Sequence, residues 1–219
     1  MNSVVRVQLT PSPEQHARLV GLQAAFAEVC NALAPVVKET RVWNRVALHH
    51  LTYKSIRERF PAIGSQMVCN AIYSVSRACR TLFQAPASPF NVAKQPGRPL
   101  PILRFADNCP VYFDRHTLSL RDGQVSIFTL DGRMRFQLAL GQAQEQAFHT
   151  RKLLEIVLSR RGAQFELSFV FAAEAPGEAV SVAQPDEGVD APQTPDQASW
   201  TGAMAAGELP EYLLIEETA

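Results

Sequence analysis

Residues 64–83, GSQMVCNAIYSVSRACRTLF, form the segment around which the rest of this chain is organised. Its apolar residues alternate between spacings of four and three, which predicts one buried stripe of an α-helix. They are Val68, Ile72, Val75, Cys79 and Leu82. The opposite face carries amides, an aromatic ring and guanidinium groups, from Gln66, Asn70, Tyr73, Arg77 and Arg80. Because no acidic residue interrupts this face, it is either plainly solvated or able to meet bases and phosphates.

The charges are distributed unevenly along the chain. The formal net charge is zero, because 21 Lys and Arg balance 21 Asp and Glu. All the basic residues lie between Arg6 and Arg161, and 11 of the acidic residues lie at or before Glu166, whereas the other 10 lie from Glu174 onward. The part up to Ala172 therefore has a net charge of +10, and the remainder has −10. A basic body suggests an anionic partner, most commonly phosphate.

The cysteines and histidines give no sign of a metal site. The cysteines, Cys30, Cys69, Cys79 and Cys109, include no CxxC pair, and the histidines add no ligand spacing. We expect reduced thiols that fill the core, no bound metal and no cofactor. No apolar run approaches the roughly 18–20 residues that span a membrane, and the N-terminus shows no secretory signal. These features predict a cytoplasmic protein with no membrane partner, with association with the nucleoid as an option.

The chain is predicted to open with a strand and a capped helix. Apolar residues alternate over 4–9, which is typical of a short strand. Ser12 is then expected to cap a helix, with Pro13 at its first position and Gln15 completing a capping box. The apolar stripe of this helix is predicted to be Leu19, Leu22, Phe26, Val29 and Leu33.

Two prolines are predicted to divide the following helices. Pro35 is expected to end or bend the first helix, and residues 36–50 are expected to be helical again. Thr52 is predicted to cap a further short helix, which Pro61 ends. The segment 64–83 follows as the last helix of this region.

From residue 84 onward the pattern changes to that of a sheet. Residues 84–98 are rich in proline and polar residues and are predicted to be an irregular connector. Beyond it the apolar period is two, and tight-turn signals stand at Asp122-Gly123, Asp131-Gly132 and Arg161-Gly162. Five or six strands, with the N-terminal one, suffice for a small antiparallel β-barrel.

The predicted fold class is therefore α+β, with a helical lobe inserted after the first strand of the barrel. The predicted parts are 1–11 and 99–172 for the barrel, 12–83 for the helical lobe, 84–98 for the connector and 173–219 for a disordered acidic tail. The final residues, LPEYLLIEETA, can form a short amphipathic turn or a docking peptide.

The order of these pieces resembles the N-terminal half of TnpB, the RNA-guided nuclease of insertion sequences, and of compact type V CRISPR effectors. The similarity covers about residues 4–176 and rests on collinear segments rather than on one diagnostic motif. These are RVQLTPSPEQHARL, CNALA, LTYKS, VCNAIYSVSRACRTLF, PILRF, DGQVSIFTLDGRMRF and LLEIVLSRRGAQFELSFVFAAEAP. The resemblance implies a wedge-like barrel and a helical recognition lobe.

The family continues into a RuvC-like nuclease lobe that opens on a strand of the type G-[IV]-D-x-G. Here residues 188–192 read GVDAP, so Asp190 would be the first carboxylate and Pro192 replaces the expected glycine. Two-metal phosphodiester cleavage needs several converging carboxylates. We therefore expect this chain, taken by itself, not to be an enzyme, and it could instead be the binding subunit of a split nuclease.

The resemblance also implies the residues that would contact nucleic acid. Those that would read a short DNA motif are Tyr53, Ser65, Gln66, Cys69, Asn70 and Tyr112. Those that would contact phosphates or RNA are Lys54, Arg57, Arg59, Tyr73, Arg77, Arg80, Arg133, Arg135, Arg160 and Arg161. Asn70 or Gln66 could bind adenine in bidentate fashion, which is worth roughly 1–3 kcal/mol of discrimination. Arg133 and Arg135 are predicted to share one strand face, opposite Met134 and Phe136.

The leading hypothesis is a nuclease-deficient, TnpB-like protein that binds a structured guide RNA and, as an extension, guide-paired target DNA. Its expected partners are that RNA, a double-stranded DNA target and, as an option, a separate nuclease subunit. Two alternatives stay open. One is an RNA-independent DNA-binding or regulatory module, and the other is a non-functional, truncated transposon remnant.

Overall fold

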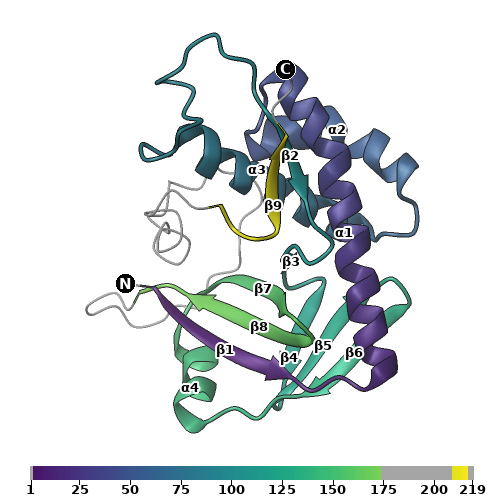
Figure 1. Ribbon diagram of the computed structural model, residues 1–219. Helices are drawn as coiled ribbons and strands as arrows, with labels where there is room; N and C mark the ends of the chain where they lie inside the picture. The colour runs from purple at the N-terminus through teal and green to yellow at the C-terminus, as the bar shows by residue number, and fades with distance from the viewer. Residues whose placement is uncertain (1, 174–208, 217–219) are drawn as a thin grey trace.

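The computed structural model describes residues 2–173 and 209–216, which form an α+β fold (Figure 1). The helices are α1 (Pro13–Thr40), α2 (Arg45–Arg59), α3 (Ser65–Gln84) and α4 (Gln142–Thr150). The strands are β1 (Ser3–Leu9), β2 (Ile102–Phe105), β3 (Val111–Phe113), β4 (Leu118–Arg121), β5 (Gln124–Thr129), β6 (Gly132–Gln137), β7 (Leu153–Arg161), β8 (Gln164–Phe171) and β9 (Leu213–Glu216). The predicted α+β class is confirmed.

The described strands form separate antiparallel sheets rather than a barrel, so the prediction of a closed barrel is wrong. Their orders are β1-β8-β7-β3, β4-β5-β6 and β2-β9. The sheet is interrupted between β3 and β4, where the carboxylate of Asp114 accepts hydrogen bonds from the amides of His116 and Thr117, each at 3.0 Å. Because this Asx-type turn uses amides that a continuing ladder would need, the chain leaves the first sheet after Phe113 and begins another.

The three predicted tight turns are confirmed. Each contains left-handed backbone, with φ of 50° at Asp122, 90° at Gly132 and 58° at Gly162. The hairpins they close have the pairings Arg121↔Gln124, Thr129↔Gly132 and Arg161↔Gln164.

Helix α1 begins as predicted but ends later than predicted. The Ser12 hydroxyl accepts from the amide of Gln15, and the Gln15 side chain accepts from the amide of Ser12, which completes the capping box. Pro35, however, lies inside the helix, which continues to Thr40 and ends at Arg41 with φ 56°. Val37, which follows the proline, is buried, and its packing stabilises the last turn of α1.

The boundaries of α2 also differ from the prediction. Residues 41–44 separate it from α1, and the side chain of Asn44 caps it by accepting from the amides of Val46 and Ala47. Thr52 is therefore not a cap. It is buried inside α2, where its hydroxyl donates to the carbonyl of Leu48 at 2.7 Å.

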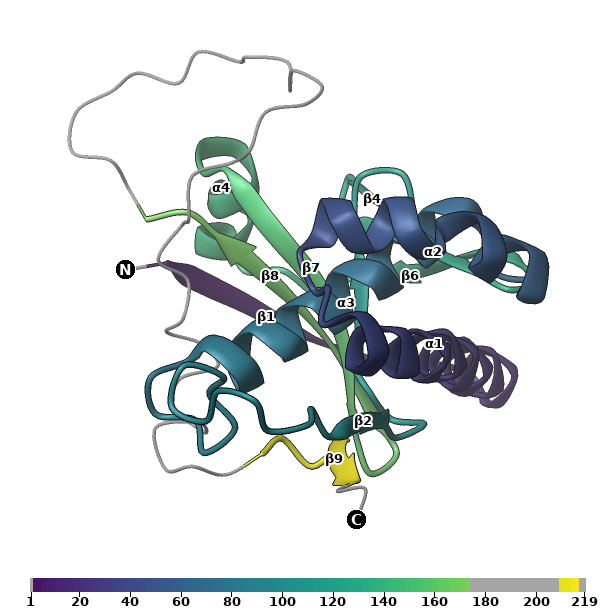
Figure 2. The ribbon, with the colours of Figure 1, turned by 90° about the horizontal axis from the view of Figure 1, so that it is seen from above.

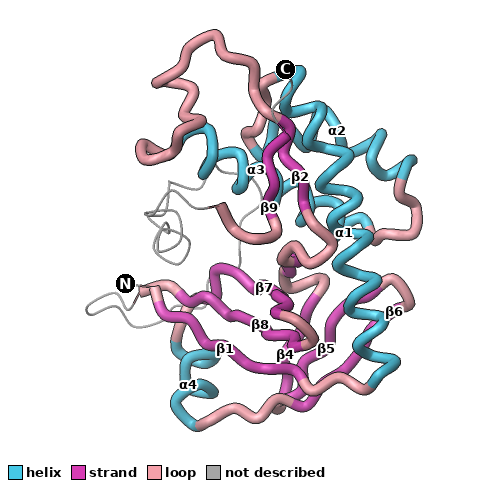
Figure 3. The backbone as a smooth tube through the Cα atoms, in the orientation of Figure 1, coloured by secondary structure: helices cyan, strands magenta, loops and turns pink. Residues whose placement is uncertain are grey.

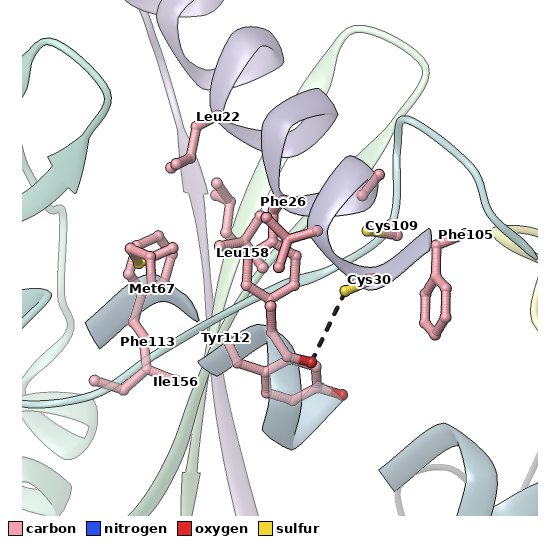
Figure 4. Packing of buried hydrophobic residues seen from close by; sticks show 14 of the residues in the cluster. Leu22, Phe26, Cys30, Met67, Phe105, Cys109, Tyr112, Phe113, Ile156 and Leu158 are labelled. Atoms are coloured by element: carbon pink, nitrogen blue, oxygen red, sulfur yellow. Dashed lines mark hydrogen bonds between the residues drawn. The ribbon is translucent and has the colours of Figure 1, made fainter. Parts of the chain in front are cut away.

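The core lies where α1 and α3 pack on each other and on the sheet. Figure 2 shows α3 at the centre of the molecule, with α1, α2, β2 and the four-stranded sheet around it. The predicted stripes of both helices are buried: Leu19, Leu22, Phe26, Val29 and Leu33 in α1, and Val68, Ile72, Val75, Cys79 and Leu82 in α3. Figure 4 shows Phe26 and Cys30 of α1 beside Cys109, Tyr112 and Leu158. These side chains are therefore close-packed in the core.

The length and hydropathy of α1 would also fit a membrane span. In the described part of the chain it is the one helix of that kind, and half of its most apolar stretch is buried inside the fold. That burial is the pattern of a core helix.

Helix α4 packs at the far end of the sheet from α2, as Figure 3 shows. Its Phe148 ring makes edge contacts with Phe169 and Phe171 of β8, at centroid distances of 4.9 and 5.1 Å. The sequence interpretation did not anticipate this helix, because its run of glutamines and alanines has little apolar period.

Strand β2 is held on both edges by segments distant in sequence. On one side the Asn31 side chain of α1 bonds the backbone of Phe105 twice, at 2.8 and 2.9 Å. On the other side β2 pairs with β9, in the register Ile102↔Glu216 to Phe105↔Leu213. The prediction of a disordered tail over 173–219 is therefore wrong for 209–216, where burial of Leu213 fixes the strand. The rest of that prediction, and Asp190 with it, concerns 174–208 and 217–219, outside the described residues.

Candidate nucleic-acid interface

Helix α2 presents one face of basic and aromatic side chains. Arg45, His49, Tyr53 and Arg57 recur every four residues, so they lie along one side of the helix. His49 stacks on Tyr53 with ring centroids 4.7 Å apart, and Arg57 donates to the carbonyl of Ile63. Only Leu48, Thr52 and Ile56 of this helix are buried. Most of α2 is therefore available to solvent or to a partner, including the exposed predicted contacts Lys54 and Arg59.

The first half of α3 lies beside this face. The Arg45 guanidinium is 5.3 Å from the centre of the Tyr73 ring, a cation–π contact between the two helices. Partial burial raises the pKa of the Cys69 thiol, while Arg45 and Arg57 act in the opposite direction. Cys69 precedes Tyr73 by one turn and therefore lies on the same side of α3. We call this region the α2–α3 surface, and define it by Arg45, His49, Tyr53, Lys54, Arg57, Cys69 and Tyr73.

Part of the polar face of α3 is turned toward the sheet rather than toward solvent. The Gln66 amide donates to the Asp114 carboxylate, and the buried Asn70 amide donates to the Thr117 hydroxyl at 3.4 Å. Both partners belong to the turn between β3 and β4. The interpretation of this face as solvated or base-reading is therefore wrong for Asn70, which is 6% exposed and bonded inside the protein.

Arg77 and Tyr112 are likewise interior residues. Arg77 forms an ion pair with Glu155 of β7, and the Tyr73 hydroxyl donates to the same carboxylate. The side chains of Arg77 and Glu155 are only 15% and 12% exposed. Burial alone would lower the pKa of Arg77, but the neighbouring Tyr112, Glu155 and Tyr73 raise it above its ordinary value. Burial raises the pKa of Tyr112, so both groups keep their usual protonation at neutral pH.

These positions correct the predicted roles of Arg77 and Tyr112. Tyr112 is 5% exposed and cannot reach a base edge in this arrangement. Arg77 links α3 to β7 instead of standing free as a phosphate anchor. The reason is that β3 packs on α3 and that Glu155 of β7 meets Arg77, which the amphipathic period of the helix alone does not indicate.

The sheet β4-β5-β6 carries a second basic face. Arg133 and Arg135 are exposed and Met134 and Phe136 are buried, as predicted. The register places Arg135 opposite Ser126, and Arg133 opposite Phe128. Arg133 also donates to the carbonyl of His116 at 2.7 Å. This face therefore presents two guanidinium groups, of which that of Arg133 is held by hydrogen bonds.

The sheet face adjoins the start of α3. An ideal Cβ on Gly64 would lie 3.0 Å from the Phe128 ring, so the two are in direct contact. The exposed Ser65 follows in the first turn of α3. The α2–α3 surface and the sheet face are thus neighbours across Gly64.

The other predicted contacts lie elsewhere. Arg80 is exposed near the end of α3. Arg160 and Arg161 belong to the β7-β8 hairpin, next to the first turn of α1, where His16 packs on Phe165 at 5.3 Å. Arg160 lies 6.0 Å from the same ring. The structure does not bring these three residues to the α2–α3 surface.

Sequence reasoning missed Arg45, His49 and Arg121. The four-residue spacing that joins Arg45 and His49 to Tyr53 and Arg57 was present in the sequence and could have indicated them. Arg121 pairs with Gln124 on the exposed face of β4-β5-β6, and its alternation with Leu120 was the available signal.

Among the described residues, no group of three or more His, Cys, Asp or Glu side chains is placed to hold a metal ion. No protein-family model and no curated protein sequence matches this chain. The clearest indication of function is therefore the chemistry of the surface itself, and the α2–α3 surface is where basic and aromatic side chains lie together.

Proposed function

We propose that this chain is a nuclease-deficient, TnpB-like protein of the cytoplasm that binds a structured guide RNA and guide-paired DNA. The observation that carries the proposal is the α2–α3 surface, where Arg45, His49, Tyr53 and Arg57 share one helix face. Arginine and lysine neutralise phosphates, and tyrosine or histidine rings stack on exposed bases. A body with a net charge of +10 adds long-range attraction for a polyanion.

The decisive experiment reverses charge on this surface. We expect Arg45→Glu/Lys54→Glu to weaken binding of a labelled oligonucleotide on the order of tenfold at 0.1 M salt. The slope of log K against log salt should fall by about two, because two phosphate contacts are lost. Fluorescence anisotropy across a salt series measures both. Neither side chain is buried, so the fold should persist.

The matched control is Lys94→Glu/Lys152→Glu, which changes net charge equally at exposed positions on the connector and at the start of β7. An equal loss in this control would show that only overall charge matters. Absence of any salt-dependent binding by the native chain would sink the proposal. A co-purified, RNase-sensitive species would support guidance by RNA, whereas duplex binding without RNA would favour the DNA-binding module instead.

Binding should also strengthen as the pH falls. Partial burial, His50 and Arg45 lower the pKa of His49 from its ordinary 6.5. Bound phosphates favour the charged imidazole, so binding is coupled to proton uptake and affinity rises as the pH falls. We expect His49→Gln to flatten this rise between pH 8 and pH 5.5, and His149→Gln on α4 to leave it unchanged.

The stability of the free chain should change in the opposite direction. Because the folded pKa of His49 is depressed, the unfolded state binds more protons below pH 6.5, and stability falls there. Affinity that decreased together with stability would mean that His49 contributes only to folding.

A further inference from the structure

A series of arginine and tyrosine side chains leads from the α2–α3 surface into the protein. Arg45 lies 5.3 Å from the Tyr73 ring, and Tyr73 contacts the Tyr112 ring edge-on at 5.4 Å. Arg77 lies 5.9 Å from the centre of the Tyr112 ring. The outer members are partly exposed, whereas Tyr112 is buried. Arginine and tyrosine side chains of the same kind as those on the surface are therefore also present beneath it.

The C-terminal segment 209–216 covers the inner end of this series. A cavity of about 20 Å³ remains between them, lined on one side by Arg77, Tyr112 and Phe105, and on the other by Tyr212 and Leu213. Burial and then the proximity of Tyr112 raise the pKa of Tyr212. The Tyr212 side chain lines the same cavity as Tyr112 and Arg77.

This segment is held by a short backbone ladder and by a small apolar contact, in which Leu209, Tyr212 and Ile215 pack on the core beside the buried Leu213. It pairs with β2 over four residues, and the amide of Ala106 donates to the carbonyl of Tyr212 at 2.9 Å. The ion pair of Arg104 and Glu216, at 2.9 Å, is half exposed and contributes little. By contrast, β7 and β8 pair over nearly their whole length. Figure 2 shows β9 at the edge of the molecule, next to β2, which is the strand it pairs with.

We propose that the segment 209–216 regulates the nucleic-acid site by covering a pocket for one unstacked base. When the segment leaves β2, the place of the Tyr212 ring becomes available to a planar base, which stacks on Tyr112 beside the Arg77 guanidinium. The ion pair of Arg77 with Glu155 is retained. This proposal rests on the proposed function, since the pocket extends the α2–α3 surface.

The burial of the two strands indicates that β9 separates from β2 while β2 stays in place on the protein. Leu213 is the one residue of β9 that is fully buried, and Leu214 is 57% exposed. Strand β2 stays attached on its other edge through Asn31. Segments with few buried apolar contacts open at lower free energy than core ladders. Opening at β9 therefore leaves the remaining fold intact.

The test uses the full chain with a reversible lock. Arg104→Cys/Leu214→Cys places two thiols at directly paired positions of β2 and β9, in a Cys69→Ser background that removes the one native cysteine that is not buried. We expect the oxidised form to bind a labelled single-stranded oligonucleotide at least about fivefold more weakly than the reduced form. The Cys69→Ser single variant, oxidised and reduced alike, is the control.

Hydrogen exchange of the nucleic-acid-free chain provides an independent measurement. The Ala106 amide should exchange faster than amides of the β7-β8 ladder, and the oxidised lock should slow it. Protection of Ala106 equal to that of β7-β8 would overturn the proposal, as would equal affinities of the locked and reduced forms. If the chain binds the oligonucleotide equally well with and without the lock, the proposed regulation by residues 209–216 is wrong, but the proposed function stands. If the native chain binds nothing, the proposed function fails, and with it the pocket.

Discussion

Replacing Glu155 by alanine is expected to lower the free energy of unfolding by about 3–5 kcal/mol. The Arg77 side chain is 15% exposed, and the Glu155 carboxylate is an ion-pair partner that helps to balance its charge between α3 and β7. Removing that partner leaves a cation enclosed with Tyr73 and Tyr112, and the Tyr73 hydroxyl also loses its acceptor. Urea denaturation followed by circular dichroism measures the effect.

Two further variants separate the charge from the packing. Glu155→Gln keeps a hydrogen-bond acceptor and should cost less than the alanine variant. The double variant Arg77→Met/Glu155→Leu removes both charges and should recover most of the stability, because an apolar pair of similar size often replaces a buried ion pair without loss. A loss below about 1 kcal/mol in Glu155→Ala would show that Arg77 finds water or another partner instead.

Replacing Phe26 by alanine should cost a similar 3–5 kcal/mol, here through a cavity. Phe26 has no exposed surface and lies among residues of α1, β3 and β7, including Tyr112 and Leu158 (Figure 4). These backbone elements are fixed by ladders and helices and cannot close the space. The same urea titration is the measurement.

The control is Leu51→Ala on α2, where the side chain is 52% exposed. This change should alter stability by no more than about 0.5 kcal/mol, as expected for a surface position. Equal losses of stability in the two variants would contradict this prediction, because they would mean that the burial of Phe26 adds nothing to the cost of its removal.

Local signals in the sequence predicted the secondary elements well. The spacing from Val68 to Leu82 determined which side of α3 is buried, and Ser12 with Gln15 located the start of α1. The Asp-Gly pairs located the hairpins because left-handed backbone there is inexpensive only for a few residue types. Pro35 misled the prediction, because packing of the following turn outweighs the missing amide donor.

Pairing between distant segments could not be predicted in the same way. Alternation shows which face of a strand is buried but not which edge finds a partner, so separate sheets and a closed barrel have the same pattern. Strand β9 is four residues long, and its partner β2 lies far away in sequence. Its pairing depends on Leu213 entering a groove that exists only once α3 and β3 are assembled.

The candidate site was predicted only in part for the same reason. The polar face of α3 was recognised, but its division between solvent and sheet depends on Asp114, Thr117 and Glu155, which come from other elements. The periodicity of one helix cannot reveal such partners. The resemblance supplied Tyr53 and Arg57, and the geometry of α2 added Arg45 and His49 to them.

Strand β2 is attached to α1 on one edge and to β9 on the other, and these two attachments form at different times during synthesis. Asn31 emerges from the ribosome before Phe105 and can hold it at once, whereas Leu213 follows Phe105 by more than a hundred positions. At translation rates of roughly 5–20 residues per second, this delay is about 5–20 s. Once β7 has also been made, Leu213 still follows Arg161 by about fifty positions, and for that last part of the interval, roughly 3–10 s, the C-terminal segment does not yet cover Tyr112 and Arg77. A ligand present at the ribosome can therefore occupy their site before the finished chain is able to cover it.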